Sequence, residues 1–222
     1  MPGAAGRAPA AARAQSLGEE VANAVSHGLG FLLAVASLPI LVWTAARHGA
    51  AADVVGASIF AGTMVLLYLV STVYHALPAG VAKRWLCRLD HAAIYVFIAG
   101  TYTPFTLGAM HGAWGWALFG VVWGMAAFGV TVKLLDRLQH PWVSTGLYVA
   151  MGWVVVVAAP WMAERIAVAG LAWLVAGGAC YTLGAIVFLF DHRVRYAHFV
   201  FHVFVLAGSC CHFFAALWYA RG

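Results

Sequence analysis

Charged residues are scarce in this chain of 222 residues, because Asp, Glu, Lys and Arg together make up only 9% of it. Hydrophobic residues make up 64% instead, and ten residues are tryptophan. A soluble domain of this length does not need so much apolar surface, so the composition excludes an ordinary soluble globular protein. The sequence therefore predicts an all-α integral membrane protein that crosses the bilayer several times.

Several motifs are also missing. The formal net charge is +5, but the basic residues stand singly between apolar runs rather than in a cluster with aromatics, so we expect no nucleic-acid partner. There is neither an HExxH helix of the thermolysin type nor a GxSxG elbow of a serine hydrolase. The four cysteines show no CxxC pairing, and we interpret them as small buried residues: Cys87, Cys180, Cys210 and Cys211.

Apolar runs long enough to cross a hydrocarbon core recur along the chain. Because the connections between them are short, neighbouring helices are expected to be antiparallel within one transmembrane domain, residues 19–222. Residues 1–18 are rich in Ala, Pro, Gly and Arg and are predicted to form a disordered cytoplasmic tail. The runs predict a seven-transmembrane helix bundle, with helices near 25–46, 54–76, 91–109, 113–134, 142–160, 166–190 and 197–219.

The basic residues are distributed unevenly between the two ends of this predicted bundle. Only Arg47, Arg165 and Arg221 fall at the end that carries the C-terminus. Since cytoplasmic loops are enriched in Lys and Arg, we predict a cytoplasmic N-terminus and a C-terminus outside, in the inner (plasma) membrane of a bacterium. The basic residues predicted at the cytoplasmic end are Arg7, Arg13, Lys83, Arg84, Arg88, Lys133, Arg137, Arg193 and Arg195.

The start of the first predicted span carries polar residues at helical spacing. Glu20, Asn23 and His27 recur three and four residues apart and therefore share one helix face. Lipid cannot satisfy such a stripe, so it must meet other helices or water. The alternative is an interfacial turn in which Asn23 or Ser26 caps the helix.

Two histidines lie four residues apart in an apolar run near the C-terminus. His198 and His202 leave the same face of a helix within ~6 Å of each other, and two neutral imidazoles can hold one metal ion. Taken alone, such a pair is more often two buried histidines with satisfied hydrogen bonds. However, successive spans cross the membrane in opposite directions. The second span therefore ends, and the third and the last begin, on the cytoplasmic side, and this places His75 and Asp90 on the same side as the pair. Three histidines and one carboxylate are thus expected at matching depth.

Two neighbouring residues have plainer interpretations. Arg88 offers an alternative role for Asp90, namely a surface ion pair of little energetic consequence. His212 lies ten residues beyond His202, which corresponds to ~15 Å of helix rise. We expect His212 to be a packing or outer-pocket histidine in the outer half of the membrane.

Three imidazoles leave a tetrahedral zinc ion one open position, which is the arrangement of catalytic zinc. That position takes a water molecule, whose pKa the ion lowers. Asp90 is then expected to be a hydrogen-bond acceptor or general base for this water rather than a fourth ligand. Ser71 would hydrogen-bond the water or polarise a bound carbonyl. The predicted metal ligands are His75, His198 and His202.

Four motifs follow one another along the predicted spans: Glu20-x-x-Asn-x-x-Ser-His-Gly, Ser71-x-x-x-His75, Leu89-Asp90-His-x-x-Ile with Ala-Gly-Thr-Tyr-Thr-Pro, and His198-x-x-x-His202. In this order they resemble the haemolysin III branch of the progestin and adipoQ receptor superfamily, over nearly the whole chain. The resemblance implies a zinc ion held by His75, His198 and His202, with Asp90 contacting the zinc water. It also implies an inward N-terminus and kinship with alkaline ceramidases, which hydrolyse a lipid amide.

The expected function is that of a zinc-dependent hydrolase acting on an amide or ester of a membrane lipid, with a role in membrane homeostasis. Membrane lipids are the expected partners, with an acyl chain lying between helices. Three alternatives remain open. They are a non-enzymatic membrane receptor or regulator with structural zinc, a pore-forming cytolysin as the family name suggests, and a protein with haem between His75 and a histidine of the last span.

Overall fold

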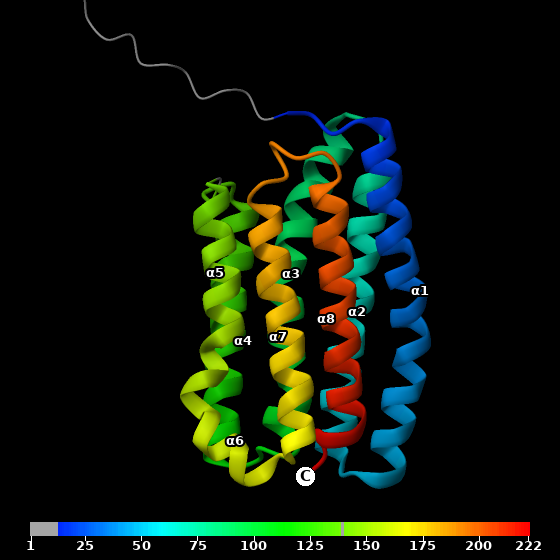
Figure 1. Cartoon of the computed structure of the whole chain (residues 1–222). Helices are drawn as coiled ribbons and strands as arrows, with labels where there is room; N and C mark the ends of the chain where they lie inside the picture. Colours follow the sequence, from blue (N-terminus) through cyan, green and yellow to red (C-terminus); the bar gives the residue numbers. More distant parts are fainter. Residues whose placement is uncertain (1–12, 139) are drawn as a thin grey trace, which may run out of the picture.

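A computed structural model describes residues 13–138 and 140–222, and within them the secondary structure is helical, without β-strands. Residues 1–12 of the predicted tail lie outside this description. Figure 1 shows the long helices standing side by side as one bundle, with the start of α1 and the C-terminus at opposite ends. The elements are α1 (Leu17–His48), α2 (Ala51–Ala76), α3 (Val81–Leu107), α4 (Ala113–Leu134), α5 (Pro141–Trp153), the 3-10 helix η1 (Val154–Ala158), α6 (Ala159–Arg165), α7 (Val168–Phe188) and α8 (Ala197–Tyr219).

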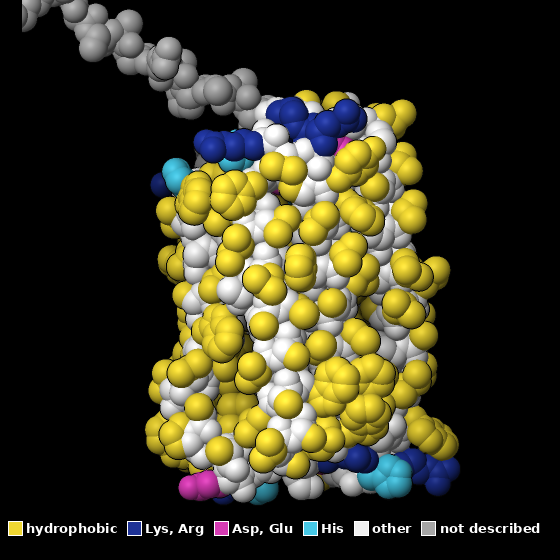
Figure 2. Space-filling view, in the orientation of Figure 1, with side chains coloured by type: hydrophobic (Ala, Val, Ile, Leu, Met, Phe, Trp, Pro, Cys, Tyr) yellow, Lys and Arg dark blue, Asp and Glu magenta, His cyan; other side chains and the backbone are white. Residues whose placement is uncertain are grey.

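Six segments of the described chain are long and apolar enough to cross a membrane, with α5, η1 and α6 counted as one. The helix α3 is not among them, because its first ten residues carry four charges and its last third is rich in Thr, Tyr and Pro. It nevertheless packs between α2 and α4. A broad belt of apolar side chains covers the face of the bundle seen in Figure 2, and the basic side chains gather at its ends. The chain is therefore a multi-pass membrane protein.

The fifth predicted span, 142–160, is not one continuous α-helix, because α5 gives way to η1. The valines at 154–157 are β-branched, which weakens α-helix formation, and Pro160 lacks a backbone donor. A side chain of α3 satisfies the backbone at this break. The hydroxyl of Tyr102 donates to the carbonyl oxygen of Gly152 over 2.6 Å.

The first helix, α1, begins eight residues before the predicted range 25–46. The Ser16 hydroxyl accepts from the backbone N–H of Glu19, and the Glu19 carboxylate accepts from the backbone N–H of Ser16. This reciprocal capping box determines where the helix begins. Asn23 is consequently inside the helix and fully buried. The alternative of an interfacial turn capped by Asn23 or Ser26 is therefore wrong.

Three helices approach closely at Gly30 of α1. A Cβ atom at this position would lie 2.6 Å from the Tyr68 ring of α2 and 2.8 Å from the Leu206 side chain of α8, so a residue without a side chain is required here. His27 lies one turn before Gly30 on α1. The first, second and last helices of the chain thus converge near the end of the bundle at which α1 and α8 begin (Figure 1).

Candidate metal centre

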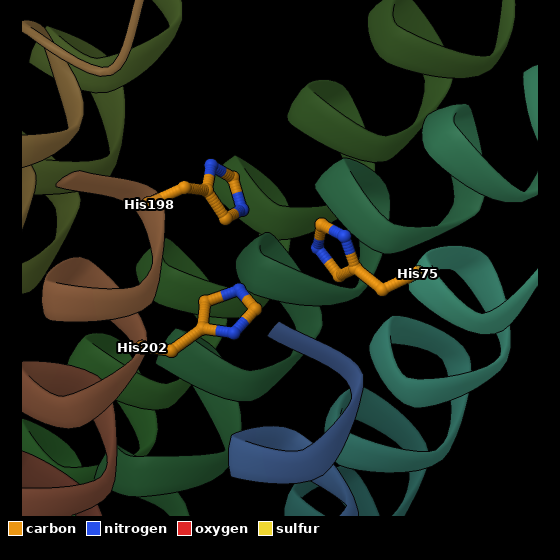
Figure 3. Close-up of side chains that lie close together, drawn as sticks. All are labelled: His75, His198 and His202. Carbon is orange, nitrogen blue, oxygen red and sulfur yellow. The ribbon is translucent and has the colours of Figure 1, made fainter. Parts of the chain in front are cut away.

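Three histidines come together where α2 ends and α8 begins. His75 on α2 and His198 and His202 on α8 each offer one ring nitrogen, and these nitrogens lie within 4.8 Å of one another. The three imidazoles face one another across the space between the two helices (Figure 3). His75 and His202 are buried, and 12% of the His198 side chain is exposed. The structure thus brings together the three residues that the sequence predicts as ligands.

Carboxylates orient two of these imidazoles. Nδ1 of His75 lies 2.8 Å from Oε2 of Glu20, and Nδ1 of His198 lies 3.1 Å from Oδ2 of Asp191. An ionised carboxylate can only accept hydrogen bonds, so each Nδ1 carries the proton and donates it. Lys83 pairs with the other oxygen of Glu20 over 2.8 Å. The lone pair of each ring is therefore on Nε2.

A hydroxyl orients the third imidazole in the same way. Nδ1 of His202 lies 3.1 Å from the Ser26 hydroxyl, whose single proton is already donated to the carbonyl oxygen of Asn23 over 2.9 Å. Ser26 can therefore only accept from His202, which places the His202 proton on Nδ1 as well. All three rings are held in one tautomer, with Nε2 free to bind a metal ion.

A metal cation fits this arrangement better than the alternatives. The buried Nε2 atoms of His75 and His198 have no hydrogen-bond partner among the residues that the structure describes, although buried polar atoms are normally paired. Metal-binding histidines typically donate their second ring nitrogen to a carboxylate or another acceptor, as these rings do. The ring centroids of His75 and His198 are 5.0 Å apart, and those of His75 and His202 are 5.1 Å apart. These separations leave no space for a haem between them.

The two residues predicted to carry chemistry lie beside the histidines. The Asp90 carboxyl on α3 is 8% exposed and neighbours both the Ser71 hydroxyl and the His198 imidazole. Arg88 does not pair with Asp90, because its guanidinium donates to the Asp136 carboxylate over 2.7 Å. The ion pair between Arg88 and Asp90 that would have explained the carboxylate is therefore not formed.

Sequence reasoning missed Asp191 and left Glu20 and His27 without a role. Asp191 lies in a connection that also carries histidine and arginine residues, where a carboxylate is easily taken for an ordinary counter-ion. A signal in the sequence could have identified Asp191, because it is the one acidic residue in the connection directly before α8, the helix that carries His198 and His202. His212 packs as expected, with its Nδ1 3.0 Å from the carbonyl oxygen of Gly208.

Replacing Asp191 with alanine should weaken the binding of added Zn²⁺ about 10- to 100-fold, because the His198 ring loses the acceptor that fixes its tautomer and orientation. Competition with a chromophoric chelator measures this affinity. The matched control is Asp136→Ala, which removes a carboxylate that pairs with Arg88 over 2.7 Å. Equal zinc affinity in the two variants would contradict the assigned role of Asp191.

Comparison with known proteins identifies a family that this chain matches over most of its length. The model of a family described as haemolysin-III related matches residues 15–213, a stretch that includes the histidine cluster and its hydrogen-bond partners. Hemolysin-3 from Bacillus cereus is 40% identical over 205 residues, which cover 92% of this chain and 93% of that protein. The Hemolysin-3 homolog of Bacillus subtilis (strain 168) is 40% identical over 201 residues, covering 90% of this chain and 94% of that protein.

The similarity extends to an animal protein. The monocyte to macrophage differentiation factor of Homo sapiens is 28% identical over 222 aligned residues, which cover 94% of this chain and 88% of that protein. This chain is thus similar along most of its length to both bacterial and mammalian proteins.

Proposed function

This chain is a member of the haemolysin III-related family, and on that premise we propose that it is a membrane-embedded zinc hydrolase that cleaves an amide or ester bond of a membrane lipid. The observation that carries the proposal is the convergence of three imidazole nitrogens beside a buried carboxyl, that of Asp90. A purely structural three-histidine site has no need of a neighbouring buried carboxyl.

Zinc is the metal that suits these ligands best. Three neutral imidazoles with fixed tautomers are typical of catalytic zinc, and three protein ligands leave one position open. A bound zinc ion would supply a Lewis acid and would lower the pKa of a water molecule. His75, His198 and His202 would hold it through Nε2, since the Nδ1 of each ring is engaged in a hydrogen bond.

The remaining groups provide acid–base chemistry. In the proposed reaction Asp90 orients the attacking water and accepts its proton, and then protonates the leaving group. Ser71 supports Asp90 by hydrogen bonding or contacts the substrate carbonyl. A lipid is the proposed substrate because apolar side chains cover the face of the bundle seen in Figure 2, where lipid acyl chains would contact the protein directly.

We further propose that the bundle has seven spans, with α3 as the seventh, and that the site faces the cytoplasm. Of the described basic residues, only Arg47, Arg165 and Arg221 lie at the end opposite the histidines. The other eight lie at the histidine end, which the positive-inside rule assigns to the cytoplasm. With seven spans the C-terminus is then outside, and the bacterial relatives support an inner-membrane location.

The direct test is lipid hydrolysis by the purified protein. Zinc-loaded protein in detergent is incubated with a total lipid extract, and released fatty acids are measured by mass spectrometry. We expect release that stops when a chelator removes the zinc and resumes when Zn²⁺ is restored. Absence of release from bacterial and animal lipid extracts alike would contradict the hydrolase proposal.

A second candidate is a regulator in which zinc is structural. It is supported by the way the cluster ties together α1, α2 and α8 through Glu20, Ser26 and the three histidines. It predicts that zinc raises thermal stability while no lipid is hydrolysed. A pore-forming cytolysin, suggested by the names of the Bacillus relatives, has less support, because the apolar belt suits a resident membrane protein rather than a released toxin.

A further inference from the structure

A fourth histidine, His27 on α1, lies against the cluster without belonging to it. Its ring is stacked on that of His202, with centroids 3.4 Å apart and planes 11° from parallel. The Tyr68 ring of α2 packs against His27 at a right angle, with a centroid distance of 5.0 Å. His27 is 3% exposed, and it is not part of the group of nitrogens within 4.8 Å of one another. It therefore needs a role other than that of a ligand.

The partner of His27 is Ser71 of α2. Hydroxyl side chains in this bundle commonly donate to a carbonyl of their own helix, as those of Ser37 and Thr72 do. The Ser71 hydroxyl instead lies 2.7 Å from Nδ1 of His27 and beside the Asp90 carboxyl. Ser71 thus links α1 to α3 through side chains alone.

The direction of this hydrogen bond follows from the other ring nitrogen. Nε2 of His27 is buried and has no hydrogen-bond partner within the described part of the chain. If Ser71 donated to Nδ1, the imidazole proton would be on Nε2 and would be a buried donor without an acceptor, which is rarer than an unpaired lone pair. Nδ1 of His27 therefore donates to Ser71. The Ser71 proton is then free to point at the Asp90 carboxylate.

We propose that His27 is a positioning residue that holds the Ser71 hydroxyl toward Asp90 and so places this carboxylate relative to the histidine cluster. This inference rests on the hydrolase function, in which Asp90 is the base. The His27 ring also lies flat on the ring of His202, a predicted metal ligand. His27 therefore contacts both this ligand and Ser71, the residue that orients the Asp90 carboxylate.

Two variants separate this role from simple packing. His27→Phe keeps a flat ring against His202 but removes the donor, whereas His27→Asn loses the ring and places an amide N–H near the former Nδ1. We expect about one zinc ion per chain in both variants, because His27 is not a ligand. The Phe variant should lower kcat about 10- to 100-fold with KM within about twofold, and the Asn variant should recover most of kcat. Full kcat in the Phe variant, or equal loss in both, would overturn the proposal.

A second measurement does not depend on catalysis. In ¹⁵N NMR spectra of histidine-labelled protein at mildly alkaline pH, assigned with the help of His27→Asn, His27 should carry its proton on Nδ1. Ser71→Ala should shift this proton toward Nε2. An Nε2–H signal for His27 in the wild type overturns the proposal even if lipids are hydrolysed. An Nδ1–H form that responds to Ser71→Ala supports it even if hydrolysis is absent, and in that case only the proposed function fails.

Discussion

His202→Ala is expected to lower the zinc content of the purified protein from about one ion per chain to less than about a tenth of that. His202 supplies one of three converging nitrogens, and its loss leaves two imidazoles on different helices to hold the ion. His75→Ala and His198→Ala should have the same effect. Metal content is measured by inductively coupled plasma mass spectrometry after gel filtration. Thermal stability should fall in parallel, because metal binding stabilises only the folded state.

The control for this experiment lies on the same helix. His212→Ala removes a partly buried imidazole whose Nδ1 contacts a backbone carbonyl and which is far from the cluster. Zinc content should remain at the wild-type level in this variant. A wild-type protein that holds no metal after exposure to Zn²⁺ would overturn the metal centre itself, whatever the variants show.

Asp90→Asn is expected to lower the rate of lipid hydrolysis about 100- to 10,000-fold while leaving the zinc content unchanged. The amide has nearly the shape of the carboxyl but cannot accept a proton from water. The rate is measured as fatty acid released per unit time from the lipid that the wild type cleaves best. Because Asp90 is outside the group of converging nitrogens, its loss separates catalysis from metal binding.

A second buried carboxylate provides the comparison for this variant. Asp53 lies at the opposite end of the bundle, where it accepts a hydrogen bond from the backbone N–H of Ala50 over 2.7 Å. Asp53→Asn should keep the full hydrolytic rate. If Asp90→Asn is equally active, the carboxyl is not the base and the structural-zinc alternative becomes the better account.

The histidine cluster is the part of the site that a sequence can predict, because it follows from two one-dimensional properties. Four-residue spacing places His198 and His202 on one helix face. The alternation of spans then decides which ends of other helices lie at the same depth, and this selects His75 and Asp90. Neither the four-residue spacing nor the alternation of the spans changes when a helix boundary is predicted several residues away from its true position, as the start of α1 was.

The hydrogen-bond partners of the cluster could not be predicted in the same way. Whether Glu20, Ser26 and His27 face α2 or α8 depends on the rotation of α1 about its own axis, which the spacing along the helix leaves undetermined. The position of Asp191 depends on the path of a connecting loop. A run of apolar residues marks the part of a helix that lies in the hydrocarbon core, not the full length of the helix. The charged first turns of α1 and α3 therefore fall outside the predicted ranges.

The convergence of α1, α2 and α8 has a consequence for the biogenesis of the protein. His75 emerges early in synthesis, whereas His198 and His202 belong to the last helix to enter the membrane. The acceptors that fix these rings come from both α1 and the connection before α8. If the cluster binds the proposed zinc ion, all three ligands are in place only after α8 has joined α1 and α2 in the bundle. Zinc occupancy would then be a marker of finished assembly, acquired only once the two ends of the chain have met in the bilayer.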